Sequence, residues 1–120
     1  MKRRAVLIVE DEPLIRQALA GFLAAEFDVH QAAGATAAMQ VLGDRFVDVV
    51  FADVQIEGDI DGFELAQWIE INYPGVIVIM TSGVAPDRNF GAGPMIEKPY
   101  ELDYVRQRIA DALQAKPARR

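Results

Sequence analysis

Three short runs of apolar residues constrain the fold of this 120-residue chain more than any other feature. They are Ala5–Val9, Val47–Ala52 and Val76–Met80, and they are rich in Val and Ile with almost no polar residues. Runs of this kind are typical of strands that are buried on both faces of a parallel sheet. Two weaker strands are predicted at Phe27–Gln31 and Pro94–Glu97.

Helical periodicity fills most of the intervals between these strands. After Pro13, apolar residues recur at three- and four-residue spacing, which predicts a helix with one inward face. That predicted face holds Leu14, Ala18, Leu19, Phe22 and Leu23. Three more helices are predicted, at Ala35–Leu42, Phe63–Tyr73 and Leu102–Ala115. Strands that alternate with helices of this length form right-handed crossovers, so we expect an α/β fold with a doubly wound, five-stranded parallel sheet.

The stretch Ser82–Pro94 breaks this pattern. Its sequence, SGVAPDRNFGAGP, carries four Pro or Gly residues after Gly83. Residues of these two types interrupt helices, so a full helix is not expected here. A short helix near Asp87–Phe90 is the most that the pattern allows, which brings the expected total to about five helices.

Composition and charge narrow the class of protein. Hydrophobic residues make up 52% of the chain, enough for the core of one domain over residues 1–120. The absence of Cys fits a reducing compartment, and the net charge of −6 argues against bulk nucleic-acid binding. The first apolar run is too short for a signal peptide or a membrane span. We therefore expect a cytoplasmic protein.

Polar residues follow the predicted strands at the same end of each strand. Glu10 and Asp11 follow the first strand, Asp53 the third, Thr81 the fourth and Lys98 the fifth. In an open α/β sheet, functional sites form at the carboxyl ends of the strands. Three carboxylates, a hydroxyl and an ammonium group are therefore expected to meet at one edge of the sheet.

This set of groups suits phosphoryl transfer to a carboxylate. Carboxylates that share a crevice repel one another, and a hard divalent cation such as Mg²⁺ or Mn²⁺ relieves that repulsion. Lys98 offers a positive charge to a phosphoryl oxygen, and Thr81 offers a hydroxyl donor. Ser82 is the alternative source of that hydroxyl. Phosphoryl transfer depends mostly on such positioning and charge neutralisation.

Four motifs, taken together, make the chain resemble the receiver domain of two-component response regulators. They are VLIVEDE with its acidic pair, VVFADV with Asp53, VIVIMTSG with Thr81, and EKPY with Lys98. Each motif alone is weak, but the four occur in the order of that family and at about its spacing. The resemblance covers nearly the whole chain.

The resemblance implies a flavodoxin-like sheet of order 2-1-3-4-5 and a role for each matched residue. Asp53 would accept a phosphoryl group from a histidine kinase or a histidine phosphotransfer protein, with Thr81 and Lys98 contacting its oxygens. Mg²⁺ or Mn²⁺ would be bound by the side chains of Glu10, Asp11 and Asp53 and by the main-chain oxygen of Gln55. Such a domain catalyses only its own phosphorylation and dephosphorylation, so it is not expected to be an enzyme in the usual sense.

The chain also departs from the family pattern. Glu57 stands where a proline is usual, and one extra residue precedes the turn at Asp61. The segment between Thr81 and Lys98 is shorter than usual, which implies a truncated or irregular fourth helix. Met95 replaces the aromatic residue usual three positions before the lysine, which leaves open whether the usual threonine–aromatic switch operates. Output is expected through a downstream protein partner, without direct DNA binding.

Three alternatives stay open beside the phospho-accepting receiver. An aspartyl-phosphate phosphohydrolase would need a second Asp two residues after the first, where this chain has Gln55. A binding module that no longer takes phosphate is suggested by the unusual Ser82–Pro94 stretch. The chain could also be the receiver portion of a hybrid histidine kinase, although Met1 and the short tail favour a free-standing regulator.

The acidic turn at Glu57–Gly62 imitates the first half of a calcium-binding loop. Its oxygen-bearing side chains alternate as in such a loop and a glycine follows, but Trp68 stands where the last carboxylate ligand should be. A solvated turn is expected instead, with Asp59 or Asp61 capping the next helix. Asp48 is expected to be a surface acid.

Overall fold

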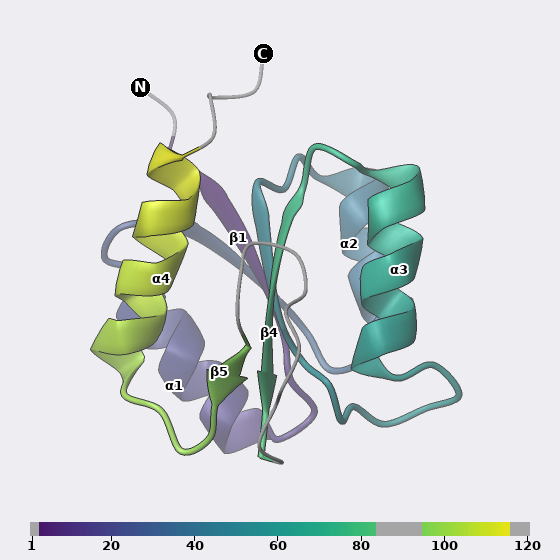
Figure 1. Cartoon of the computed structure of the whole chain (residues 1–120), viewed down its shortest axis with the longest axis horizontal. Helices are drawn as coiled ribbons and strands as arrows, with labels where there is room; N and C mark the ends of the chain where they lie inside the picture. Colours follow the sequence, from purple (N-terminus) through teal and green to yellow (C-terminus); the bar gives the residue numbers. More distant parts are fainter. Residues whose placement is uncertain (1–2, 84–94, 116–120) are drawn as a thin grey trace.

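A parallel sheet of five strands forms the centre of the computed structural model, which describes residues 3–83 and 95–115. The strand order is β2-β1-β3-β4-β5, and every pairing is parallel (Figure 1). The strands are β1 (Ala5–Val9), β2 (Asp28–Ala32), β3 (Val49–Asp53), β4 (Ile77–Ser82) and β5 (Ile96–Glu97). This order confirms the predicted doubly wound sheet.

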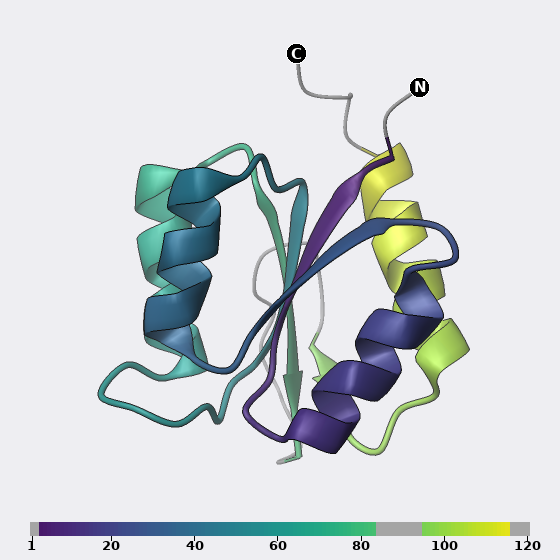
Figure 2. The ribbon, with the colours of Figure 1, turned by 180° about the vertical axis from the view of Figure 1, so that it is seen from behind.

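Four helices are found among the described residues, and they cover both faces of the sheet. Helices α2 (Ala35–Asp44) and α3 (Gly62–Asn72) lie together on one face, and α1 (Pro13–Leu23) and α4 (Leu102–Gln114) lie on the other (Figures 1 and 2). None of the helices in the described part of the chain is long and apolar enough to cross a membrane. The short helix considered near Asp87–Phe90 and the expected truncation of the family's fourth helix fall in 84–94, outside the described residues.

Each face of the sheet has its own hydrophobic core, because alternate residues of a strand point to opposite faces. Leu7 and Val50 pack with Leu65 of α3 on one face. Ile8 and Phe51, their neighbours along the strands, pack on the other face with Leu19, Val105 and Ile109 among others. The central strands β1, β3 and β4 are buried along their whole length, as their unbroken apolar sequences predicted.

The predicted inward face of α1 is partly wrong. Leu19 and Leu23 are buried as expected, and Ala20 completes the buried stripe. Leu14, however, is 76% exposed and Phe22 is 39% exposed. A helix turns once in about 3.6 residues, which places Leu14 almost opposite the centre of the buried stripe. Three- and four-residue spacing indicated a helix correctly, but it grouped the exposed residues Leu14, Ala18 and Phe22 with the buried stripe.

Asp48 is not the free surface acid that was expected. Its side chain is only 12% exposed, and one of its oxygens accepts a hydrogen bond from the Ala5 N–H at 2.8 Å. Its other oxygen lies 3.5 Å from Nε of Arg4. Asp48 therefore ties the start of β1 to the residue that precedes β3, and so helps to set the register of the two strands that end at the acidic edge.

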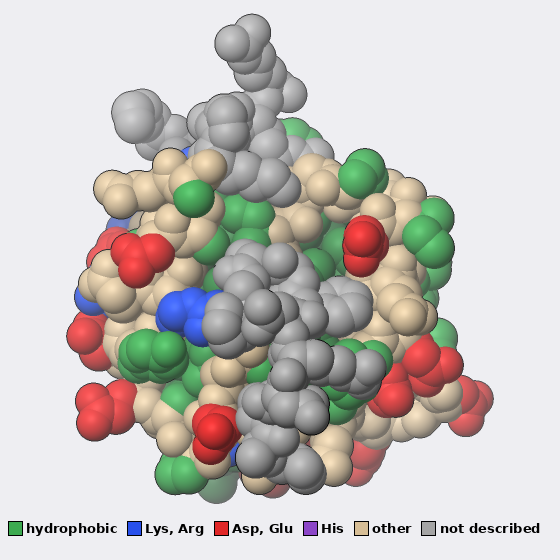
Figure 3. Space-filling view, in the orientation of Figure 1, with side chains coloured by type: hydrophobic (Ala, Val, Ile, Leu, Met, Phe, Trp, Pro, Cys, Tyr) green, Lys and Arg blue, Asp and Glu red, His purple; other side chains and the backbone are tan. Residues whose placement is uncertain are grey.

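The loop between β3 and α3 brings the start of the helix close in space to the end of the strand. Asp61 caps α3: its side chain accepts the Glu64 N–H at 2.9 Å, and Glu64 accepts the Asp61 N–H at 3.1 Å. This reciprocal arrangement satisfies two N–H groups that a helix start leaves unpaired, and it confirms the capping role predicted for Asp61. Glu57, Asp59 and Asp61 are exposed, and acidic side chains crowd this corner of the molecule at the lower right of Figure 3.

Candidate functional site

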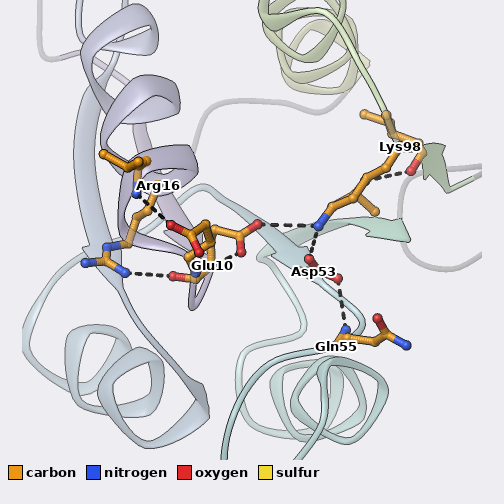
Figure 4. A network of polar contacts seen from close by, with 9 residues as sticks. Glu10, Arg16, Asp53, Gln55 and Lys98 are labelled. Atoms are coloured by element: carbon orange, nitrogen blue, oxygen red, sulfur yellow. Dashed lines mark hydrogen bonds and ion pairs between the residues drawn. The ribbon is translucent and has the colours of Figure 1, made fainter. Parts of the chain in front are cut away.

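Three of the predicted site residues meet at the carboxyl ends of β1, β3 and β5. Glu10 directly follows β1, Asp53 is the last residue of β3, and Lys98 directly follows β5. The Lys98 ammonium group forms an ion pair with Oδ2 of Asp53 and lies 3.7 Å from Oε1 of Glu10 (Figure 4). The single charge of Lys98 thus lies beside two carboxylates and reduces their mutual repulsion.

Both carboxylates are almost fully buried, at 3% exposure for Glu10 and 4% for Asp53. Each is held by a main-chain N–H two residues further along the chain. The Gln55 N–H donates to Oδ1 of Asp53 at 2.9 Å, and the Glu12 N–H donates to Oε2 of Glu10 at 3.1 Å. One oxygen of each carboxylate is therefore fixed by the backbone, while the other oxygen faces Lys98.

Burial and charge shift the proton affinities of this group. Burial raises the pKa of Glu10, although the hydrogen bond from Glu12 and the charge of Lys98 act against that rise. For Lys98, burial is the largest single influence and acts to lower the pKa, but the hydrogen bond and charge of Asp53, together with Glu10, outweigh it and leave the pKa raised. The ammonium form of Lys98 is therefore firmly held in the folded protein.

Thr81 is buried beside Asp53, and its hydroxyl is already engaged. The two residues are paired in register across β4 and β3, and Thr81 is only 1% exposed. Its hydroxyl donates a hydrogen bond to the carbonyl oxygen of Ile96 in β5 at 2.7 Å. Ser82, the alternative hydroxyl, is also buried, at 6% exposure. The Thr81 hydroxyl would have to leave Ile96 before it could bind a group attached to Asp53.

The donor atoms of this edge suit a hard cation, although they do not form a ready-made metal cluster. No group of three or more His, Cys, Asp or Glu side chains in the described ranges is arranged to hold a metal ion. The Lys98 ammonium group sits between the carboxylates of Glu10 and Asp53 and supplies the positive charge there. Carboxylate and main-chain oxygens are nevertheless the ligands that Mg²⁺ and Mn²⁺ prefer. In their chemistry, the residues fit such an ion.

Arg16 is a part of this site that the sequence did not reveal. From α1, its guanidinium group reaches back and donates a hydrogen bond at 2.9 Å to the main-chain oxygen of Glu10 (Figure 4). This contact fixes the end of β1 against α1 and so positions the turn that carries the acidic pair. A basic residue one to two helical turns after an acidic pair was the available signal, but such a residue more often faces solvent.

A family model described as the response regulator receiver domain matches residues 6–110 of the chain. The chain is 35% identical over 111 residues to a putative response regulator NtrX-like from Rickettsia felis, a match that covers 86% of this chain and 23% of that protein. The chain thus spans less than a quarter of the length of the curated relatives that it matches at this level.

Solved structures that resemble this chain include receiver domains. A signal receiver domain of an HD domain-containing protein from Pseudomonas fluorescens Pf-5 is similar with a TM-score of 0.84 and 28% identity, over 95% of this chain and 97% of that one. A CheY-like response regulator receiver domain protein from Methanospirillum hungatei JF-1 is similar with a TM-score of 0.86 and 25% identity, over 95% and 96% of the two chains.

Proposed function

We propose that this chain, which belongs to the response regulator receiver domain family of two-component signalling, accepts a phosphoryl group on Asp53. The donor would be a phosphohistidine of a histidine kinase or of a histidine phosphotransfer protein. The observation that supports this most is the state of the Asp53 carboxylate. It is buried at the end of a central strand, with one oxygen held by the Gln55 N–H and the other facing the Lys98 ammonium group.

In the proposed reaction, a carboxylate oxygen of Asp53 attacks the phosphorus of the phosphohistidine. A P–O bond forms as the P–N bond breaks, and the imidazole leaves with the electron pair of that bond. Lys98 turns from the carboxylates toward the phosphoryl oxygens and balances their charge. Thr81 releases the carbonyl oxygen of Ile96 and donates its hydroxyl to the phosphoryl group. Such a step depends mainly on positioning and charge neutralisation.

Mg²⁺, or Mn²⁺, is the proposed cofactor. Its ligands would be the side chains of Glu10, Asp11 and Asp53 and the main-chain oxygen of Gln55. When bound, the ion would neutralise part of the charge that develops on the phosphoryl oxygens. The role of the chain is to hold these oxygens at one edge of the sheet, which the Glu12 and Gln55 N–H groups and the Arg16 guanidinium do through the contacts described above.

The consequence of phosphorylation would be a change in a partner-binding surface. β4 and β5 are paired only through the last two residues of β4. Movement of Thr81 away from Ile96 would therefore alter the pairing of these two strands. Output through a protein partner rather than through DNA, action in the cytoplasm and one domain over residues 1–120 remain parts of this proposal. Met95 stands in the place of the aromatic residue that is usual in the family, and its side chain is buried in the core rather than at the surface. Whether it takes over the role of that residue in the switch is also part of the proposal.

Intact-mass measurement after incubation with Mg²⁺ and a small phosphodonor tests the central step. We expect the wild-type protein to gain the mass of one phosphoryl group and Asp53→Asn to gain none. Asp59→Asn, which removes an exposed acid of the neighbouring turn, should gain it as the wild type does. No gain by the wild type, under conditions that phosphorylate a control receiver, would contradict the proposal. Unchanged NMR spectra with Mg²⁺ and beryllofluoride would then favour a binding module that works without phosphate.

A further inference from the structure

The connection between β2 and α2 touches both halves of the proposed metal-binding edge. Where β2 ends, the Ala32 oxygen accepts a hydrogen bond from the Glu10 N–H at 3.0 Å. Where α2 is about to begin, Gly34 forms an isolated parallel bridge with Glu57, in the loop that joins β3 to α3 (Figure 2). This short connection therefore reaches from the acidic pair to the loop that carries Gln55.

Gly34 lies so close to Glu57 that a side chain at this position does not fit without a shift. A Cβ atom at position 34 would stand 3.2 Å from the main-chain oxygen of Glu57, which is nearer than an ordinary van der Waals contact of 3.4–4 Å. The overlap is small, so the neighbouring chain would have to yield by a few tenths of an ångström. The glycine thus sets how closely the β3–α3 loop approaches the start of α2.

Neither the backbone conformation nor the helix start calls for glycine at position 34. Gly34 is the N-cap of α2, with φ −165° and ψ −174°, an extended conformation that any residue adopts. Glycine has no side-chain oxygen to cap this helix, whereas Ser at an N-cap accepts a main-chain N–H of the first turn. A serine would therefore serve the helix at least as well. The reason for glycine that remains is the space beside Glu57.

The β3–α3 loop is held on both sides of Gln55. Before it, the Gln55 N–H donates to Oδ1 of Asp53 at 2.9 Å. After it, Ile56 is 8% exposed in the core on the α2 and α3 face, and the main chain of Glu57 lies against Gly34. Because peptide groups are rigid planes, a displacement at Glu57 turns the groups just before it, and these include the Gln55 carbonyl.

We propose that Gly34 is a positioning residue for the metal: its lack of a side chain lets the Glu57 main chain sit where it holds the Gln55 oxygen in place for Mg²⁺. Gly34 does not touch the ion in this role. Mg²⁺ demands near-ideal octahedral geometry, so a ligand displaced by a few tenths of an ångström binds it less well. Contacts behind the ligands commonly tune metal affinity in this way. The inference rests on the proposed function and extends it to a residue outside the acid–hydroxyl–lysine set.

The test adds a side chain at position 34 while keeping a good N-cap for α2. Gly34→Ser does this, and Gly43→Ser is the matched control: Gly43 is an exposed residue near the other end of α2, where a Cβ atom would meet no atom within 4 Å. Thermal unfolding is followed without Mg²⁺, and the Mg²⁺ affinity is measured by NMR titration. Gly34→Ser should melt no lower than the wild type, yet bind Mg²⁺ about tenfold more weakly. Gly43→Ser should keep the affinity of the wild type.

An unchanged Mg²⁺ affinity of Gly34→Ser would overturn the proposal, whatever its melting temperature, because a purely structural role affects stability alone. Equal weakening by Gly34→Ser and Gly43→Ser would overturn it too, since a side chain at position 43 makes no such contact.

The wild type supplies a second measurement, which decides the matter even if Gly34→Ser does not fold. During the Mg²⁺ titration, the amide signals of Gly34 and Glu57 should move together with that of Gln55, while the signal of Gly43 stays in place. A stationary Gly34 signal beside a moving Gln55 signal would overturn the coupling. A wild type that binds no Mg²⁺ at all would instead defeat the proposed cofactor, and this inference with it.

Discussion

The main chain of Gly62, at the start of α3, lies directly against the carbonyl oxygen of Asp53, at the end of β3. A Cβ atom at position 62 would stand 2.2 Å from that oxygen and 2.6 Å from the Cα of Val54. The Gly62 N–H also donates a hydrogen bond to the Val54 oxygen at 2.8 Å. Glycine is therefore needed here for close approach between the helix start and the strand that carries Asp53.

Gly62→Ala is accordingly expected to be strongly destabilising. The methyl group would collide with backbone atoms, which cannot rotate away as a side chain can, so we expect a loss of about 3 kcal/mol in the free energy of unfolding. Gly21→Ala is the matched control. Gly21 is an exposed residue of α1, and a Cβ atom there would meet no atom within 4 Å. That change should stabilise the protein by about 0.5–1 kcal/mol. Urea unfolding measures both, and equal stabilities would contradict the close-approach argument.

Glu10→Gln is expected to make the unloaded protein more stable while weakening its magnesium binding. Burial of Glu10 raises the pKa of this carboxyl, so its ionised form is less favourable in the folded protein than in the unfolded chain. Removing that charge should raise the free energy of unfolding by roughly 1 kcal/mol. A gain of this size is typical when a residue that serves function at the expense of stability is replaced.

The control for Glu10→Gln is Glu12→Ala. Glu12 is exposed, and its side chain caps α1 by accepting the Leu14 N–H at 3.4 Å. Loss of this cap should lower the stability by up to about 1 kcal/mol and leave the Mg²⁺ affinity near that of the wild type. Chemical unfolding together with a Mg²⁺ titration by NMR distinguishes the two variants. A less stable Glu10→Gln protein would show that the contacts of Glu10 with Lys98 and Glu12 outweigh its burial.

Arg16→Met is expected to loosen the turn that carries the acidic pair. The substitution keeps most of the aliphatic stem but removes the hydrogen bond to the Glu10 oxygen, which should cost about 1 kcal/mol of stability. Because that bond positions the end of β1, the Mg²⁺ affinity should fall as well. Arg16→Lys retains a donor and should restore part of both quantities. Loss of stability with an unchanged Mg²⁺ affinity would limit Arg16 to a structural role.

Alkaline conditions should destabilise the protein between about pH 10 and pH 12. The pKa of Tyr100 rises to about 12 in the folded state from an ordinary value of 10.0. In this window the unfolded chain has released the phenol proton and the folded chain still holds it, so stability falls as the pH rises. Lys98 acts in the same direction, because its pKa is also raised by folding.

Tyr100→Phe separates the contribution of Tyr100 to this pH dependence from that of Lys98. Without the phenol, the loss of stability across this pH window should be shallower, and what remains should come from Lys98 and other groups. Tyr104→Phe serves as the control and should keep the slope of the wild type. Urea unfolding at a series of pH values gives the slopes, and identical slopes for wild type and Tyr100→Phe would refute the buried, proton-retaining state of this hydroxyl.

Local sequence accounts for the architecture because buried parallel strands leave a strong pattern. The runs at Ala5–Val9, Val47–Ala52 and Val76–Met80 predicted β1, β3 and β4 to within a few residues. Their carboxyl ends meet at one edge in any fold of this class, which is why the meeting of Glu10, Asp53 and Lys98 could be predicted. The cap at Asp61 was similarly predictable, since a helix start recruits its acceptor from its own neighbourhood.

The local pattern failed where a residue's surroundings come from elsewhere in the chain. Leu14 has the spacing of a buried residue, but only the docking of α1 on the sheet decides which side of the helix is covered. Asp48 looks like a surface acid until β1 brings Ala5 and Arg4 against it. Hydrophobic periodicity indicates that a helix has an apolar face, but it does not indicate which part of the protein packs against that face.

The sequence by itself therefore determined the fold class, the strand order implied by family resemblance, and the edge at which the charged groups gather. Only the tertiary structure decided how those groups are paired. It placed Lys98 between two carboxylates, bound the Thr81 hydroxyl to the Ile96 oxygen, and left the Tyr100 hydroxyl buried without a hydrogen-bond partner among the described residues. The physical reason is range: secondary structure and strand direction follow from neighbours along the chain, whereas hydrogen bonds and ion pairs depend on ångström-scale contacts between residues far apart in sequence.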